Sequence, residues 1–196
     1  MSREDKLTEI LASLAKWAYD HLLKQLITPE GGVGVVETVG SGYSVEEDRM
    51  VQIERLRMLG MEAVGNPVFA PRDGKTHCNR SSKFIAEGMG YYGLPANTLA
   101  NDFIAILAIA PGWVEDTIDR AHKAAMRGQL AFVCLEDHPH GHIAAVAPEP
   151  MEFSGSWGVE VPLLFNVGRE NGLMKASKVY RAASIPSLRA FVREEV

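Results

Sequence analysis

The sequence predicts an α+β fold in which helices come first and a small antiparallel β-sheet follows. Up to about residue 127, apolar residues recur at the three- and four-residue spacing that is typical of amphipathic helices. After Gly128 the pattern changes to short apolar runs separated by turn residues, which is typical of strands. The links between these runs are short, so we expect neighbouring strands to be antiparallel.

The composition is that of an ordinary globular protein. The chain has 196 residues, of which 46% are hydrophobic and 23% are charged. This length predicts one domain at residues 61–196, preceded by a helical segment at residues 1–60. The net charge of −5 argues against general attraction to nucleic acid or to an anionic membrane.

The sequence shows neither a membrane span nor a secretory signal. It contains no run of 18 apolar residues, so we expect no transmembrane segment. Polar residues interrupt the N-terminal helical pattern, which differs from that of a signal peptide. The localisation is therefore open: we expect a cytoplasmic protein, or one exported by a non-classical route.

The helical half of the chain contains several periodic segments. We expect helices at residues 7–22, 45–59, 79–89, 100–107 and 113–127, the last one ended by Gly128. The glycine- and valine-rich residues 31–43 predict a flexible connection or hairpin, and residues 60–71 predict an extended segment. In the second half we expect strands at residues 129–135, 142–147 and 162–167.

The two cysteines have different surroundings. Cys134 lies in an apolar run and is typical of a buried cysteine that packs as a small hydrophobic residue. Cys78 lies between His77 and Asn79, where a loop enters a helix, among polar and cationic neighbours. The positive end of a helix dipole lowers the pKa of a thiol, so we expect Cys78 to be a reactive nucleophile.

Among the histidines, His142 is the best candidate for a partner of that thiol. It opens an apolar strand, where its imidazole could act as a base toward Cys78 and as an acid toward a leaving amine. His77 is a weaker candidate because neighbouring side chains at a helix start point in different directions. Two further histidines, His138 and His140, belong to the preceding loop.

A third polar group should orient the imidazole. Asn166 is the best candidate, because it is a polar residue at the end of an apolar strand and needs a partner if it is buried. Alternatively, Asn166 has a purely structural role as a turn or cap residue. Weaker alternatives for the orienting role are Glu160, Glu170 and Asn171.

Several of these segments resemble the CHAP and NlpC-type superfamily of papain-like cysteine amidases and endopeptidases. They are residues 76–79 around Cys78, residues 94–97 and 99–102, the segment opened by Trp113, and residues 141–146 around His142. The resemblance covers roughly residues 65–185. It implies a papain-like domain whose cysteine-bearing helix packs on the sheet that bears the histidine.

The resemblance also implies an activity. It identifies Cys78 as the nucleophile and His142 as the base of a hydrolase that cleaves amide bonds in peptidoglycan peptides without a cofactor. Asn166 matches the third position only by strand order. We expect His77, Asn79 and Trp157 to contact the substrate. No inhibitor protein is evident from the sequence.

Two other functions compete with hydrolysis. His138, His140 and His142 alternate along a segment rich in ligand-type residues, which could form a metal site. Alternatively, the domain could be a non-catalytic module that binds a peptide or glycan. In that case Trp157 would line a groove, unless it is only a loop anchor packed on the core.

Overall fold

The computed structural model describes residues 45–72, 74–94 and 99–194. The predicted helix at residues 7–22 and the glycine-rich connection at residues 31–43 lie outside the described residues. From Gln52 onward the chain forms one compact unit, and the contacts below belong to it. The predicted domain division at residue 60 stays a prediction.

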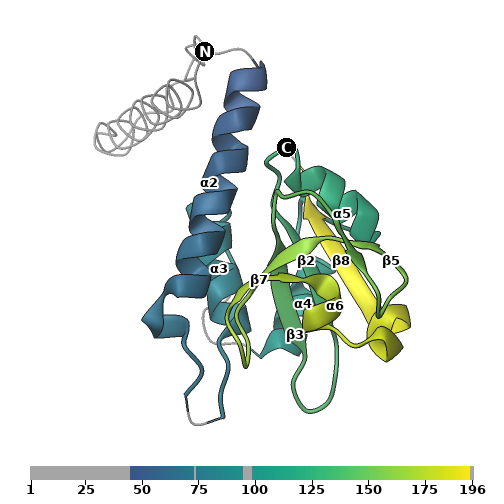
Figure 1. Cartoon of the computed structure of the whole chain (residues 1–196). Helices are drawn as coiled ribbons and strands as arrows, with labels where there is room; N and C mark the ends of the chain where they lie inside the picture. The colour runs from purple at the N-terminus through teal and green to yellow at the C-terminus, as the bar shows by residue number, and fades with distance from the viewer. Residues whose placement is uncertain (1–44, 73, 95–98, 195–196) are drawn as a thin grey trace, which may run out of the picture. The chain divides into compact units, whose positions relative to one another are not determined.

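The described part of the chain is a mixed α+β structure, as predicted (Figure 1). Its helices are α2 (Val45–Gly65), η1 (Pro67–Phe69), α3 (Cys78–Gly88), α4 (Ala100–Leu107), α5 (Ile118–Ala125), α6 (Ala176–Val179) and η2 (Ala182–Ser187). Its strands are β1 (Trp113–Asp116), β2 (Ala131–Leu135), β3 (His142–Val146), β4 (Glu152–Ser154), β5 (Val159–Val161), β6 (Leu163–Asn166), β7 (Gly172–Lys175) and β8 (Leu188–Arg193). None of these helices combines the length and apolar character that a membrane span needs.

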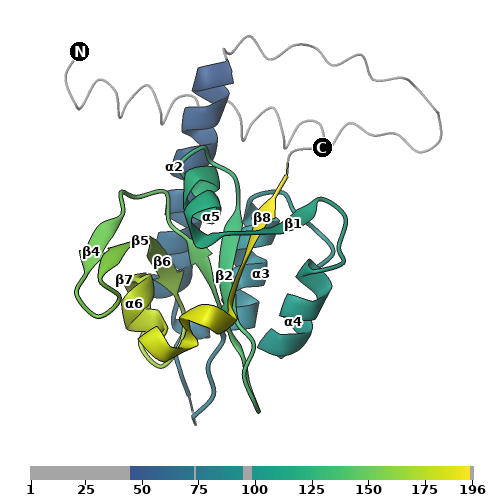
Figure 2. The same ribbon diagram turned by 90° about the vertical axis from the view of Figure 1, so that its right-hand side faces the viewer.

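The main sheet has six strands in the order β1-β8-β2-β3-β6-β7 (Figure 2). All neighbouring pairs are antiparallel, which confirms the predicted direction. Strands β4 and β5 form a separate two-stranded sheet. The C-terminal strand β8 lies between β1 and β2, so the end of the described chain completes the sheet.

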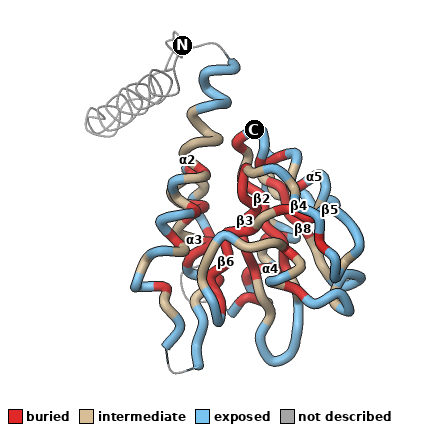
Figure 3. The backbone as a smooth tube through the Cα atoms, in the orientation of Figure 1, coloured by how far each residue is buried: buried red, intermediate tan, exposed pale blue. Residues whose placement is uncertain are grey.

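Helices cover both faces of the main sheet. Helix α3 contacts β3, whereas α5 contacts β2 and β8, and Figures 1 and 2 show these two helices on opposite faces. Four consecutive residues of β2 and four of β3 are therefore buried (Figure 3). A strand that is covered on both faces reads as a continuous apolar run, which explains why both strands were visible in the sequence.

Two sequence predictions about the helices were wrong. The segment 113–127 is not one helix: residues 113–116 form strand β1, which pairs with β8, and α5 begins only after Thr117. Thr117 Oγ1 accepts a hydrogen bond from the backbone N–H of Arg120 at 3.2 Å, which caps the helix there. The other error concerns residues 60–71, because α2 continues to Gly65 and a 3-10 helix follows.

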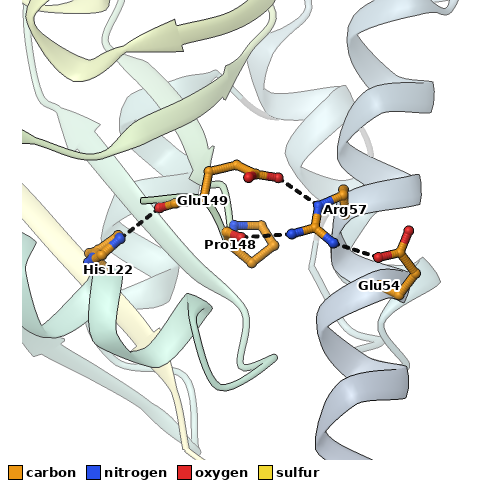
Figure 4. A network of polar contacts seen from close by, with 5 residues as sticks. All are labelled: Glu54, Arg57, His122, Pro148 and Glu149. Carbon is orange, nitrogen blue, oxygen red and sulfur yellow. Dashed lines mark hydrogen bonds and ion pairs between the residues drawn. The ribbon is translucent and has the colours of Figure 1, made fainter. Parts of the chain in front are cut away.

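A polar network joins α2 to the segment after β3 (Figure 4). The Arg57 guanidinium contacts Glu54 Oε2 at 2.5 Å and Glu149 Oε1 at 2.6 Å. It also donates to the carbonyl of Pro148 at 3.1 Å. His122 of α5 donates from Nε2 to the carbonyl of Glu149 at 2.8 Å. Residues 148–149 are thus held by both α2 and α5.

Candidate functional site

Cys78 is the first residue of α3, as the sequence predicts. The residue is only 5% exposed. His77 occupies the N-cap position without capping the helix through its side chain. The first backbone N–H groups of a helix have no partner within the helix. At α3 these groups lie next to the thiol.

Several hydrogen-bond donors lie near the Cys78 sulfur. The backbone N–H groups of Ile143, Asn79 and Cys78 itself, and the side chain of Thr76, favour the thiolate and lower the pKa of Cys78. The contact with Ile143 places the sulfur beside the peptide that joins His142 to Ile143. The start of α3 and the start of β3 therefore meet at the thiol.

These contacts do not make Cys78 a low-pKa thiol. Burial raises the pKa of the Cys78 thiol, and this effect outweighs the hydrogen bonds, which lower the pKa. The N–H groups of Cys78 and Asn79 at the helix start do lower the pKa of the thiol, but burial raises it by more, so the predicted net lowering is not found. The net upward shift favours the neutral thiol over the thiolate.

His142 and Asn166 meet because they lie on adjacent strands. Ala145 of β3 pairs with Phe165 of β6. The same antiparallel register places Asn166 opposite Ala144, which is two residues after His142. Residues related in this way share one face of a sheet and lie within reach of each other. His142 Nε2 donates to Asn166 Oδ1 at 2.8 Å.

The amide of Asn166 is held in one orientation. Its Nδ2 donates to the carbonyl of Glu170 at 2.6 Å and lies 3.8 Å from the sulfur of Met174. Its Oδ1 is therefore the atom that faces His142, and it can only accept. In the neutral ring the proton must then reside on Nε2, which leaves Nδ1 as a free base.

The surroundings of His142 favour its neutral form. Burial lowers the pKa of His142, and the hydrogen bond to Asn166 raises it by a smaller amount. The ring of Tyr180 packs edge-on against the imidazole, with centroids 5.6 Å apart. The Tyr180 hydroxyl donates to the carbonyl of Val133 at 2.6 Å, which anchors that ring in the core.

Asn101 of α4 holds the loop that leads into β3. Its Nδ2 donates to the carbonyl of Asp137 at 2.9 Å, and its Oδ1 accepts from the N–H of Asp137 at 3.4 Å. Gly141 packs directly against the same side chain, and a Cβ there would lie 2.1 Å from Asn101 Oδ1. Gly141, the residue before His142, therefore lies directly against α4.

The three alternatives to Asn166 either face solvent or make other contacts. Glu160 is exposed in β5, and Glu170 contributes its backbone carbonyl to Asn166. Asn171 accepts from the N–H of Gly168 at 3.1 Å and donates to the carbonyl of Phe69 at 3.2 Å. Asn171 therefore links the turn after β6 to η1.

The structure separates the histidines of the proposed metal cluster. His138 and His140 are exposed in the loop between β2 and β3, whereas the imidazole of His142 is bound to Asn166. Within residues 45–72, 74–94 and 99–194, no three His, Cys, Asp or Glu side chains gather closely enough to hold a metal ion.

The predicted substrate-contacting residues lie in two places. His77 and Asn79 flank the thiol and are half-buried. Trp157 lies in the turn between β4 and β5, which is not part of the sheet that bears His142. Its ring packs against the hydrophobic core, and its backbone N–H donates to Ser154 Oγ at 3.3 Å, whereas the indole Nε1 is buried without a hydrogen-bond partner among the described residues. This is the geometry of a loop anchor.

Sequence reasoning missed three residues that position the site, namely Thr76, Asn101 and Tyr180. Thr76 precedes Cys78 by two residues, so a search for local hydroxyl donors could have found it. Tyr180 and Asn101 approach from segments distant in sequence, and nothing in their local sequence indicates the contact.

The chain shows no significant match to a protein-family model or to a curated protein. The comparisons therefore assign no family.

Proposed function

We propose that this protein is a papain-like cysteine hydrolase that cleaves a peptide amide bond. The observation that carries the proposal is the pair formed by His142 and Asn166, which leaves Nδ1 of the imidazole as a base. The Cys78 thiol lies at the backbone of the adjacent residue, Ile143. A nucleophile, a base and an orienting group are the three parts that such a reaction needs.

The proposed reaction begins with a neutral thiol and a neutral imidazole. As the sulfur of Cys78 attacks the substrate carbonyl, its proton passes to Nδ1 of His142. In this proposal the backbone N–H groups at the start of α3, those of Cys78 and Asn79, stabilise the oxyanion. The imidazolium then gives its proton to the leaving amine, and water hydrolyses the thioester with His142 acting again as the base.

We propose a peptidoglycan peptide as the substrate. Support for this choice comes from the motifs around Cys78 and His142, which resemble those of the CHAP and NlpC-type amidases and endopeptidases. The arrangement of Cys78, His142 and Asn166 supports the hydrolysis of an amide in general, but it does not favour one bond of the peptide over another. The bond that is cut must therefore be identified from the products.

The first test replaces the nucleophile. Cys78→Ala should abolish release of peptides from muropeptides, measured by mass spectrometry of the products, because the attacking atom is gone. The free energy of unfolding should change by only about 1 kcal/mol, since little volume is removed. Cys134→Ala is the matched control: it removes a buried cysteine from β2 and should retain turnover.

Unchanged activity in Cys78→Ala would rule out the mechanism. If both the wild type and Cys78→Ala leave the substrate intact, a non-catalytic peptide- or glycan-binding module becomes the better proposal. The burial of Cys78 and the raised pKa of its thiol favour this second function. Such a module would bind muropeptides with similar affinity in both proteins, which a titration would show.

A further inference from the structure

A pocket lies at the other end of α3 from Cys78. It has a volume of about 420 Å³ and is formed by three groups of residues. These are the segment after α3 (residues 90–94), the segment before β1 together with Trp113, and Arg193 at the end of β8. All of them belong to the compact unit that begins at Gln52.

This pocket is separate from the proposed active site. Helix α3 has 11 residues, with Cys78 as the first. At a rise of about 1.5 Å per residue the helix is about 16 Å long. The pocket begins two residues beyond its last residue, Gly88. A ligand in the pocket would therefore not reach the thiol unless it were an extended molecule.

Arg193 gives the pocket a positive charge. Its guanidinium lies over the ring of Tyr91, 5.0 Å from the centroid, and donates to the carbonyl of Pro111. Its Nε is buried and has no hydrogen-bond partner. In the described part of the chain, Arg193 forms no ion pair with a carboxylate. A half-buried guanidinium is stabilised by an anion that pairs with it.

The remaining walls are aromatic and apolar. Trp113 stacks on Phe132 with centroids 5.4 Å apart and meets Tyr91 edge-on at 6.3 Å, so these rings are fixed by the core. Tyr92 is 74% exposed at the rim, and Leu94 is buried at the wall. The pocket thus combines one cation with preorganised apolar surface.

We propose that this pocket binds a carboxylate that is attached to an aromatic or apolar group. The guanidinium pairs with the carboxylate, and the rings of Tyr91, Tyr92 and Trp113 contact the apolar part. A volume of about 420 Å³ is within the range of small-molecule sites, about 300–1,000 Å³. Both a small aromatic acid and the C-terminal residue of a peptide carry this chemistry. The proposal does not depend on the hydrolase activity.

The test is a titration of the whole chain with small ligands, monitored by ¹H–¹⁵N NMR. The probes are phenylacetate, N-acetyl-phenylalanine and N-acetyl-phenylalanine amide. The two acids should shift the signals of residues 90–94 and of the Trp113 indole. The uncharged amide should bind about tenfold more weakly than its acid, because it lacks the charge-assisted hydrogen bonds. Tighter binding of N-acetyl-phenylalanine than of phenylacetate would indicate a peptide C-terminus.

Substitutions identify which residues bind the carboxylate and which bind the apolar group. Arg193→Gln should abolish the difference between acid and amide, whereas Tyr92→Ala should weaken both ligands to a similar extent. Arg181→Gln, which removes an exposed arginine outside the pocket, should change neither. Equal binding of acid and amide by the wild type would overturn the proposal, as would shifts that map away from residues 90–94. The wild-type comparison decides the question even if Arg193→Gln fails to fold.

Discussion

At the scale of single residues, the hydrogen bond between His142 and Asn166 decides where the imidazole proton resides. Asn166 Oδ1 accepts at 2.8 Å, and the other end of the amide is fixed by the carbonyl of Glu170. Nδ1 is left without a proton in the neutral ring. The orientation of one buried amide therefore determines whether His142 can act as a base.

The pH dependence of turnover should follow His142. Its pKa lies below the ordinary value of about 6.5 because burial disfavours the charged ring. The neutral form of His142 is therefore favoured at pH 7, and kcat/KM of the proposed hydrolysis should fall only as the pH drops below about 6.5. In Asn166→Ala, loss of the group that raises this pKa should move the acid limb to lower pH and reduce kcat. An acid limb above pH 7 in the wild type would contradict this assignment.

Alkylation by iodoacetamide should report the state of Cys78. Because burial raises the pKa of this thiol above its ordinary value of about 8.5, labelling should be slow at pH 7 and still increase above pH 8.5. Cys134, which is buried in β2 and has a strongly raised pKa, should react more slowly still. Mass spectrometry of the two peptides separates the rates. Fast labelling of Cys78 that levels off below pH 8 would show a preformed thiolate instead.

At the scale of elements, the loop between β2 and β3 leads directly into His142, the first residue of β3. Gly141 leaves room for Asn101 of α4, since a Cβ there would lie 2.1 Å from Asn101 Oδ1 and 2.6 Å from the carbonyl of Leu135. One of these contacts is with backbone, which cannot move aside easily. The close approach of α4 to this loop therefore requires glycine.

Gly141→Ala should consequently disturb both folding and the site. We expect a loss of about 1–3 kcal/mol in the free energy of unfolding, as for other overpacked positions, together with a lower kcat. Gly155→Ala is the matched control, because a Cβ there meets nothing within 4 Å. Chemical denaturation and turnover measure the two effects. Equal stability of the two variants would show that the α4 contact does not hold the loop.

At the scale of the whole unit, the second part of α2 belongs to the core of the domain. Leu56, Gly60 and Ala63 are buried, and a Cβ at Gly60 would lie 2.2 Å from the ring of Phe165 in β6. The helix therefore touches the strand that ends at Asn166. The network around Arg57 adds a polar contact to the same helix (Figure 4).

Gly60→Ala should therefore weaken the domain. The added methyl group must displace either α2 or Phe165, which we expect to cost about 1–3 kcal/mol of the free energy of unfolding. Gly65→Ala, at the end of the same helix, meets nothing within 4 Å and should be neutral or slightly stabilising. Thermal unfolding of the two variants makes the comparison. A stable Gly60→Ala protein would mean that α2 is not closely packed on β6.

Much of the fold could be predicted because local patterns were strong. The predicted start of α3 and the bounds of α4 agree with the structure to within one residue, and β2, β3 and β6 all fall inside predicted strands. Strands β1 and β8 could not be predicted in this way, because they pair with each other across about 75 residues of sequence. Without its partner strand, β1 resembles the first turn of the helix that follows it.

Cys78, His142 and Asn166 could likewise be selected from sequence, because each is a polar residue at the start or end of an apolar element. Their catalytic roles stay predictions. The sequence by itself determined which elements form and which side chains can carry chemistry, since both depend on residue types and short-range periodicity. Only the tertiary structure decided that Asn166 reaches His142, that Arg193 lies in a pocket and that burial raises the pKa of Cys78. Strand register and desolvation depend on contacts between residues distant in the chain.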